Sequence, residues 1–155
     1  GAGPFPSELN DELGDRLVDI GREFGTVTGR RRRAGWLDCV MLRHAVRLNS
    51  LTELAVTKLD VLDTFETIRV CVGYRIDGSD VENYPDLPDV LERAEPVYVD
   101  LEGWQSDSTT ARMPADLPPQ AQAFIRLIEE QVGVPVRIIG VGAERDDYVL
   151  WGSSS

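Results

Sequence analysis

The residues best suited to chemistry lie in a short loop, Gly25–Arg33, whose sequence is GTVTGRRRR. Two hydroxyl side chains, Thr26 and Thr28, stand between two glycines, and four consecutive arginines, Arg30–Arg33, follow them. Planar guanidinium groups pair bidentately with carboxylates or phosphates, and glycine lets backbone N–H groups join such a site. The alternative is a solvated basic stretch ahead of a helix, although the helix macrodipole disfavours arginine at a helix N-terminus. We therefore favour an anion-binding loop.

A second group of candidate residues, Thr57–Asp60 (TKLD), follows an apolar segment with the composition of a strand. Ligands of open α/β sheets lie outside the carboxyl ends of strands. The Asp60 carboxylate can accept both the N1–H and the 2-amino N–H of guanine, a donor pair that adenine lacks, while the stem of Lys58 lies along the base. An ordinary ion pair at a strand end explains the same four residues, and without further information it is the simpler interpretation.

A third segment, Gly140-Val141-Gly142, follows another apolar stretch, and its glycines would let the backbone approach a planar ligand. A simple turn explains it equally well. The chain has one histidine, His44, so neither a multi-histidine metal site nor a Ser-His-Asp or Cys-His set is indicated. The sequence also has no glycine-rich phosphate loop that ends in Lys-Ser or Lys-Thr. We expect binding residues here, with no catalytic residue and no metal ligand.

The composition excludes several classes of protein. A length of 155 residues, 42% of them hydrophobic, fits one domain or a piece of one. A net charge of −11 argues against nucleic-acid and anionic-membrane partners. No run of eighteen apolar residues exists, so no membrane-spanning helix is predicted. Cys39 and Cys71 lie in apolar stretches, which indicates buried thiols in a reducing compartment rather than a disulfide framework.

Helical spacing of apolar residues predicts the helices that must position these loops. One helix is expected over residues 7–19 with Ser7 as its N-cap, and a second over 37–48, ended by Asn49. The pair Pro118-Pro119 opens a further helix that Gly133 closes. A short helix is expected at residues 88–93, within a long irregular excursion over 84–116, and the glycines and prolines of residues 1–6 predict an irregular start.

Apolar and β-branched segments predict four strands, over residues 53–61, 67–74, 135–141 and 148–151. The first is expected to be a buried central strand, because Leu54, Ala55 and Val56 run without alternation. Asp77-Gly78 indicates a hairpin turn. The order of helices and strands predicts an α/β fold, a mostly parallel sheet with flanking helices.

Several segments, taken in order along the chain, together resemble adenylosuccinate synthetase: GAGPFPSE, EFGTVTGRRRR with GWLD, VTKLDVLD, EPVY, and a Pro-Pro helix leading to GVPV and a glycine-rich loop. The resemblance covers nearly the whole chain but only the C-terminal third or so of that enzyme, so residues 1–155 are interpreted as a C-terminal fragment of a single domain. It implies that a missing N-terminal portion completes the sheet and holds the phosphate loop, the catalytic Asp and His and the Mg²⁺ ligands. We therefore expect the fragment alone to be inactive.

The resemblance implies a ligase of AMP biosynthesis, a cytoplasmic homodimer that joins IMP and L-aspartate into adenylosuccinate with GTP as co-substrate. It assigns aspartate and IMP binding to Thr26, Val27, Thr28, Gly29, Arg30, Arg31 and Arg32. It assigns GTP binding to Arg32, Lys58, Leu59, Asp60, Gly140, Val141 and Gly142.

Two positions depart from the family pattern: Val27 stands where Thr is frequent, and Gly140 where Ser is common. The last residues, 148–155, follow no pattern of the family and receive no role. Two other functions remain open, a guanine-nucleotide-binding module without catalysis and a purely structural acidic domain. Because the family's guanine segment matches residues 58–60, the resemblance favours the ligand site over the strand-end ion pair there.

Overall fold

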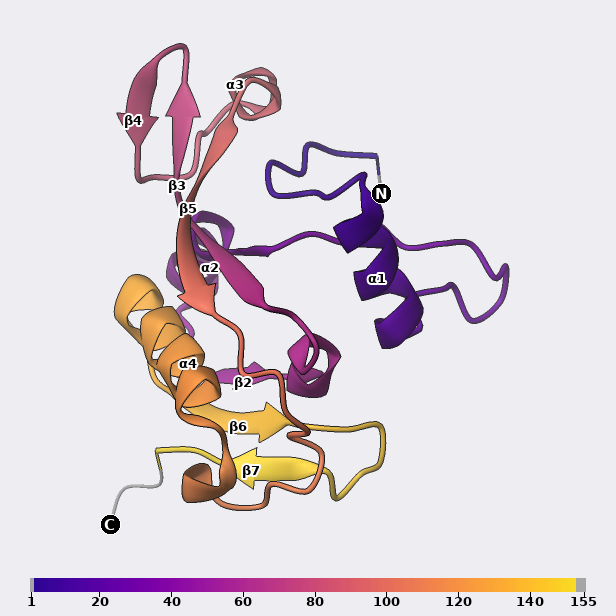
Figure 1. Cartoon of the computed structure of the whole chain (residues 1–155). Helices are drawn as coiled ribbons and strands as arrows, with labels where there is room; N and C mark the ends of the chain where they lie inside the picture. Colours follow the sequence, from indigo (N-terminus) through magenta and orange to yellow (C-terminus); the bar gives the residue numbers. More distant parts are fainter. Residues whose placement is uncertain (1, 153–155) are drawn as a thin grey trace. The chain divides into compact units, whose positions relative to one another are not determined.

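The structure, a computed structural model, describes residues 2–152 (Figure 1). The chain divides into two compact units. Unit 1 holds the residues up to His44 together with Arg69–Val99, and unit 2 holds Ala45–Ile68 together with the residues from Asp100 onward. The arginine loop therefore belongs to unit 1, and both candidate guanine segments belong to unit 2.

Unit 1 is built on a mixed sheet. Its elements are α1 (Glu12–Gly21), β1 (Leu37–Asp38), the first part of α2 (Cys39–Asn49), most of β3 (Thr67–Ile76), β4 (Ser79–Val81), α3 (Pro88–Glu92) and most of β5 (Glu95–Glu102). Strand β1 pairs in parallel with β3, with Asp38 opposite Cys71, and β4 pairs antiparallel with β3. Strand β5 pairs with β3 as well and runs opposite to it in Figure 1.

A buried carboxylate fixes the junction between β1 and α2. Asp38 is 7% exposed, and its Oδ1 accepts hydrogen bonds from the backbone N–H groups of Val40 (2.9 Å) and Met41 (3.1 Å), so it caps the start of α2. Its Oδ2 accepts a hydrogen bond from the Tyr74 hydroxyl. Val40, Cys71 and Tyr74 pack in the apolar core of unit 1, so the cap is also tied to that core.

The helix predicted over residues 7–19 begins later, at Glu12, and the predicted cap is wrong. Asp11 is the N-cap of α1, and its side chain accepts from the Gly14 backbone N–H at 3.1 Å. Ser7 is buried and donates from Oγ to the Trp36 carbonyl at 2.7 Å. Residues 7–9 instead extend along residues 34–36 through the antiparallel bridge between Glu8 and Gly35. That pairing occupies the residues that would have formed the first helical turn.

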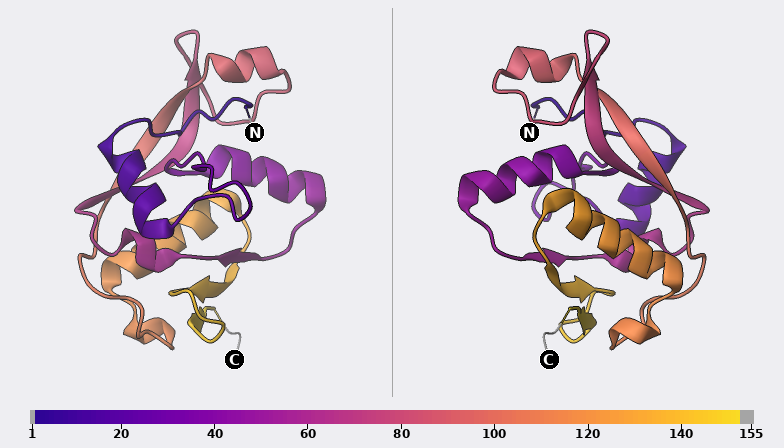
Figure 2. Two further views of the ribbon diagram at one scale, coloured as in Figure 1. Left: turned by 90° about the vertical axis from the view of Figure 1, so that its right-hand side faces the viewer. Right: turned by 90° about the vertical axis from the view of Figure 1, so that its left-hand side faces the viewer.

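Unit 2 is built on a three-stranded sheet in the order β2-β6-β7. Its elements are the end of α2, β2 (Leu54–Val56), the 3-10 helices η1 (Leu59–Leu62) and η2 (Pro114–Asp116), α4 (Pro119–Val132), β6 (Val136–Gly140) and β7 (Tyr148–Leu150). Helix α4 lies alongside this sheet in Figures 1 and 2, and Phe124, Ile125 and Ile128 are buried on it. Gly133, with φ of +81°, ends α4 as predicted.

The predicted α/β class with flanking helices is confirmed, but the sheets within this chain are mixed rather than mostly parallel. The β1–β3 and β2–β6 pairs are parallel, whereas β3–β4 and β6–β7 are antiparallel. The β3–β4 hairpin turns at Asp77-Gly78, as predicted, with φ of +51° and +83°. Hairpins of this kind add short antiparallel strands that the α/β order of elements did not indicate.

One strand prediction was wrong in detail, and one strand was not predicted. The strand expected over residues 53–61 is only the three residues of β2, because Lys58 adopts a left-handed backbone (φ +59°) and starts η1. It is not a buried central strand either: within the described chain it pairs with β6 alone, and Ala55 is exposed. The irregular excursion over 84–116 contains the predicted short helix, as α3, and also β5, whose acidic residues weaken its apolar pattern.

Candidate functional site

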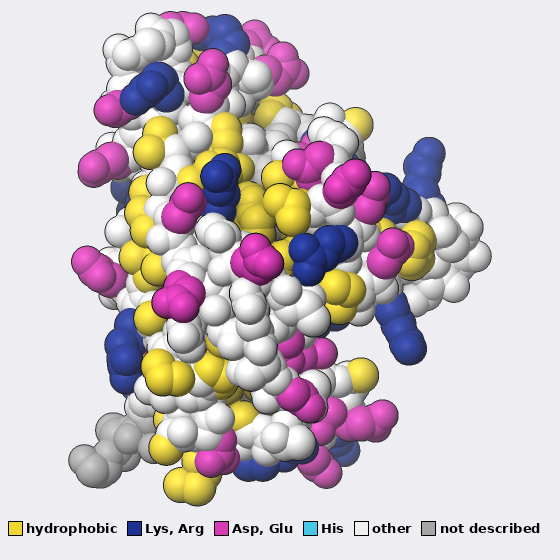
Figure 3. Space-filling view, in the orientation of Figure 1, with side chains coloured by type: hydrophobic (Ala, Val, Ile, Leu, Met, Phe, Trp, Pro, Cys, Tyr) yellow, Lys and Arg dark blue, Asp and Glu magenta, His cyan; other side chains and the backbone are white. Residues whose placement is uncertain are grey.

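The arginine loop is a hairpin-like excursion of unit 1. Phe24 and Arg31 form an antiparallel bridge, and the Gly25 N–H donates to the Arg30 carbonyl at 2.7 Å. The Gly29 N–H donates to the Gly25 carbonyl at 2.9 Å, and Gly29 has φ of +65°, a conformation that favours glycine. The loop projects at the right of Figure 1, and basic side chains stand out from it in Figure 3. Backbone hydrogen bonds thus hold the loop in a defined shape.

The first arginine of the run differs from those that follow it. Arg31 pairs with Asp15 at 2.5 Å, and Arg32 pairs with Glu23 at 3.1 Å. Both pairs are partly exposed to solvent, so each contributes little to stability and can exchange for another anion. Arg30 has no hydrogen bond or ion pair from its side chain to any described residue. Its guanidinium is the one best placed to take a ligand carboxylate.

Arg33, by contrast, is part of the scaffold. Its Nε and Nη2 donate to the two carboxylate oxygens of Glu8, at 2.9 and 2.6 Å, and Nη1 donates to the Gly3 carbonyl at 2.7 Å. The guanidinium also lies 5.5 Å from the centre of the Phe5 ring. This bidentate bond lowers the pKa of the Glu8 carboxyl and raises the pKa of Arg33. Arg33 therefore anchors the N-terminal segment to the loop.

An open hollow of about 890 Å³ adjoins the loop, and it is lined by Ala2, Phe5, Gly25, Thr28 and Arg30–Arg33. Thr28 shapes its wall, since its Oγ1 accepts from the Arg30 backbone N–H at 3.3 Å. Val27, where the family often has Thr, is 95% exposed at the tip of the loop. The hollow is large enough for a small dicarboxylate and is bordered by guanidinium groups.

The two candidate guanine segments, 80 residues apart in sequence, are neighbours in unit 2. Strands β2 and β6 are parallel, with Val56 opposite Ile139, so their carboxyl ends meet at one edge of the sheet. A Cβ at Gly140 would lie 3.4 Å from the Thr57 Cα and 3.5 Å from the Lys58 nitrogen. The sequence motifs 57–60 and 140–142 therefore lie side by side, at the kind of strand ends where ligands bind in α/β sheets.

Within this site, the side chains divide into buried anchors and accessible groups. Leu59 is 1% exposed and Val141 is fully buried, so these two predicted binding residues can offer only backbone atoms to a ligand. Lys58 is exposed and stands at the start of η1, and Asp60 is partly buried in its first turn. Burial is the main cause that raises the pKa of Asp60, and the nearby Asp63 and Asp147 carboxylates raise it further. Hydrogen-bond donors from a ligand would compensate the charged Asp60 carboxylate for its loss of hydration.

Asp147 is a residue of this site that the sequence analysis missed. Its backbone carbonyl accepts from the Val141 N–H at 2.8 Å. Its carboxylate lies against Gly142, where a Cβ would come within 2.4 Å of Oδ2. Asp147 stands in the acidic stretch AERDD, where no local pattern separates it from solvated charges. Only the return of the chain through the β6–β7 connection reveals its position.

The remaining candidates of the sequence analysis have structural contacts. His44 stacks on Tyr84, with ring centres 4.3 Å apart. Trp104 donates from Nε1 to the Asp63 carboxylate at 2.6 Å and packs on Phe124, and Trp36 is buried. Over residues 2–152, no group of three or more His, Cys, Asp and Glu side chains is arranged to hold a metal ion. Across the same residues, none of the helices has the length and apolar character needed to span a bilayer.

Comparisons with known proteins match nearly the whole chain to one family. A family model described as adenylosuccinate synthetase matches residues 1–149. Curated adenylosuccinate synthetases from Anaeromyxobacter sp. (strain Fw109-5) and Halothermothrix orenii are each 52% identical to this chain, over 97% and 96% of it. A solved structure of fully ligated adenylosuccinate synthetase from Plasmodium falciparum is 39% identical over 97% of this chain, with a TM-score of 0.92.

The chain spans only part of these relatives. It covers 35% of both curated proteins and 36% of the solved chain. The matched region nevertheless includes the arginine loop and both candidate guanine segments, because the family match extends over nearly the whole sequence. This chain belongs to the adenylosuccinate synthetase family.

Proposed function

We propose that the protein containing this chain joins IMP and L-aspartate into adenylosuccinate with GTP, and that the chain supplies the guanine pocket and the aspartate loop. One observation carries the proposal more than any other. The segments that resemble the family's guanine contacts, 57–60 and 140–142, adjoin at the carboxyl ends of two parallel strands. Membership of the family supports the same activity.

In the guanine pocket, Asp60 provides the specificity. Its carboxylate accepts from N1–H and from the 2-amino group of guanine, and these donors offset the desolvation that raises its pKa. The Lys58 stem lies along the base. Leu59 and Val141 are buried, so they act through their backbone, and Gly140 and Gly142 let that backbone approach the ring. Adenine lacks both donors and would leave the carboxylate unpaired.

In the arginine loop, Arg30 takes a carboxylate of the amino acid. Its guanidinium has no partner among residues 2–152 and borders the hollow beside Thr28. Arg31 and Arg32 complete the site by exchanging their partly exposed partners, Asp15 and Glu23, for ligand anions. The family resemblance also assigns GTP binding to Arg32. Thr26, Val27 and Gly29 contribute backbone groups, and Val27 offers no hydroxyl of its own.

These residues bind and orient the substrates. In the proposed reaction the 6-oxygen of IMP is phosphorylated by GTP, and the aspartate amine then displaces phosphate at C6. Two carboxylates held by guanidinium groups fix the direction of that amine, which converts an encounter in solution into an oriented attack. The described residues offer no cluster for Mg²⁺, so we assign no step through the metal to this chain. The family resemblance carries the further expectation of a cytoplasmic homodimer.

The test uses the whole protein that contains this chain, which is called the full-length protein below. Formation of adenylosuccinate is followed with IMP, aspartate and GTP, and then with ATP in place of GTP and with aspartate omitted. The proposal predicts that adenylosuccinate forms only when IMP, aspartate and GTP are all present, and that none forms when ATP replaces GTP. Tight binding of GDP without any ligation would instead favour the guanine-nucleotide-binding module. Absence of both binding and ligation would leave only the structural acidic domain.

A further inference from the structure

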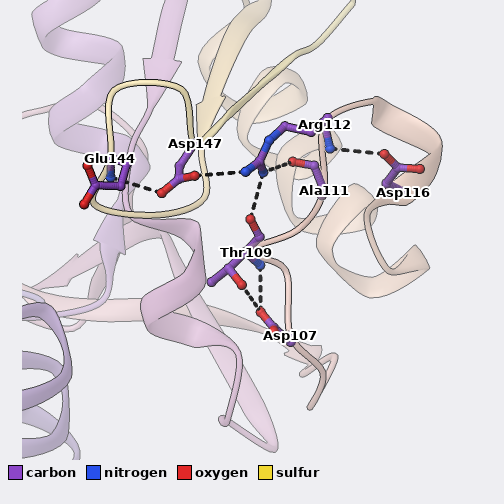
Figure 4. A network of polar contacts seen from close by, with 7 residues as sticks. All are labelled: Asp107, Thr109, Ala111, Arg112, Asp116, Glu144 and Asp147. Atoms are coloured by element: carbon purple, nitrogen blue, oxygen red, sulfur yellow. Dashed lines mark hydrogen bonds and ion pairs between the residues drawn. The ribbon is translucent and has the colours of Figure 1, made fainter.

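One arginine outside the candidate site reaches back to it. Arg112 lies in the connection between β5 and α4, and its guanidinium makes three hydrogen bonds (Figure 4). Nη1 donates to the carbonyls of Thr109 (2.8 Å) and Ala111 (2.7 Å) in its own loop, and Nη2 donates to the Asp147 Oδ1 at 2.9 Å. The two carbonyls fix the plane of the guanidinium, and the third bond is directed at another loop.

The loop that carries Arg112 is itself held in place. The Asp116 carboxylate accepts from the backbone N–H groups of Arg112 (3.1 Å) and Met113 (3.0 Å). Farther back, the Asp107 carboxylate accepts from the backbone N–H and the hydroxyl of Thr109. Figure 4 shows these two carboxylates at opposite ends of the same segment. Arg112 therefore projects from a base with little freedom of its own.

The receiving residue, Asp147, braces the loop that follows β6. Its Oδ2 accepts from the Glu144 backbone N–H at 3.0 Å, and its backbone carbonyl accepts from the Val141 N–H at 2.8 Å. The carboxylate also lies directly against Gly142. One carboxylate oxygen thus binds the Glu144 N–H of this loop and the other binds Arg112, so the arginine holds the side chain that lies against Gly142.

We infer that Arg112 is a positioning residue for the guanine base, which it serves through Asp147 by holding the Gly140–Gly142 segment beside Lys58 and Asp60. This inference rests on the proposed guanine pocket. Arg112 touches no substrate in this role. Its charge also balances Asp147, one of the carboxylates that act on Asp60. Loss of Arg112 would release the loop and leave uncompensated negative charge near the guanine acceptor.

Arg137 provides a matched control. It lies in the same unit, on β6, and its guanidinium also bonds a carboxylate and a backbone carbonyl, those of Glu53 (3.1 Å) and Gly152 (2.5 Å). The exposed fractions of the two side chains are similar, 49% for Arg112 and 40% for Arg137. Arg137→Ala therefore removes contacts of the same kind without releasing the Asp147 side chain.

The experiment measures GDP and ADP affinity by calorimetry, and KM for each substrate, in the full-length protein and both variants. We expect Arg112→Ala to let this loop shift by about 1 Å. Such a shift should weaken GDP binding and raise the KM for GTP by about 10-fold to 100-fold. ADP affinity and the KM values for IMP and aspartate stay within about 2-fold, and Arg137→Ala changes none of them. Equal effects of the two variants, or a parallel rise of all three KM values, would overturn the inference.

The binding measurement separates this inference from the proposed activity. If the wild-type protein binds GDP but ligates nothing, the proposed function fails while the Arg112 variant still tests the inference. If the wild-type protein ligates and Arg112→Ala keeps its full GDP affinity, the inference alone fails. A wild-type protein that binds no guanine nucleotide would overturn both.

Discussion

Gly140 lies directly against Thr57, and a Cβ at position 140 would stand 3.4 Å from the Thr57 Cα. This contact follows from the parallel pairing of β6 with β2. It brings a glycine-rich segment near the end of the chain to the segment that carries Lys58 and Asp60. The proposed guanine pocket depends on this one juxtaposition more than on any single side chain.

The two glycines of this segment are predicted to differ in their tolerance of a methyl group. At Gly140 the added Cβ makes ordinary contacts at 3.4 Å and beyond, so Gly140→Ala should change stability by less than about 0.5 kcal/mol. At Gly142 it would meet the Asp147 carboxylate at 2.4 Å, and overpacking of this kind costs about 1–3 kcal/mol. Urea unfolding of the full-length variants measures both. Equal midpoints for the two variants would contradict the placement of Asp147.

The arginine run is predicted to separate into a ligand-binding and a structural part. Arg30→Leu should leave the urea midpoint unchanged but lower kcat/KM for aspartate, since a lost charge-assisted pair costs about 2–5 kcal/mol. Arg33→Leu removes the bidentate bond to Glu8 and the bond to Gly3, and should lower the midpoint. Aspartate kinetics and unfolding curves of both variants decide the matter. Unchanged aspartate kinetics in Arg30→Leu would return the run to a solvated basic stretch.

The two cysteines are predicted to make stability depend on alkaline pH. Both are buried, and burial raises the pKa of Cys39 from 9.0 to about 11 and that of Cys71 from 9.0 to about 12. The unfolded thiols therefore lose their protons at lower pH than the folded ones. Their contribution to stability is complete below pH 9 and declines as pH rises from there toward 11 and 12.

The measurement for the cysteines is the free energy of unfolding between pH 8 and pH 10.5. Each thiol steepens the decline by at most about 1.4 kcal/mol per pH unit. Cys39→Ala and Cys71→Ala should each flatten the curve relative to the wild-type protein, whatever they do to its height. Identical slopes in wild type and variants would show that the thiols do not differ in pKa between the folded and unfolded states.

Local sequence patterns predicted those parts of the molecule that local physics controls. The Pro-Pro start and Gly133 end of α4, the Asp77-Gly78 turn and the short strand β6 follow from backbone preferences of nearby residues. The start of α1 could not be predicted in this way. Ser7 has the composition of a cap, yet its pairing partner, Trp36, lies 29 residues away. A long-range strand contact outcompeted a local capping preference.

In the candidate site, too, local sequence predicted some residues, and long-range contacts determine the rest. Residue types made Asp60, Lys58 and the arginine loop candidates, because the chemistry of carboxylates, lysines and guanidinium groups can be inferred from the residue type alone. The distinct situations of Arg30 and Arg33 were not visible, since they depend on where Glu8 and Gly3 lie in space. Arg112 and Asp147 were missed for the same reason: their bond joins loops 35 residues apart. Positions whose role is to hold other residues leave no local pattern.

The Asp60→Asn substitution in the full-length protein tests most directly whether Asp60 recognises guanine through hydrogen bonds. The substitution replaces one acceptor with an amide donor, which then faces the 2-amino donor of guanine, whereas xanthine offers a carbonyl at that position. The measurement is kcat/KM with GTP and with XTP, for wild type and variant. Sites built on such hydrogen bonds discriminate by as much as about 10⁴-fold, so the XTP-to-GTP ratio should rise by at least about 100-fold. An unchanged ratio would contradict the account and make Asp60 an ordinary carboxylate at a strand end.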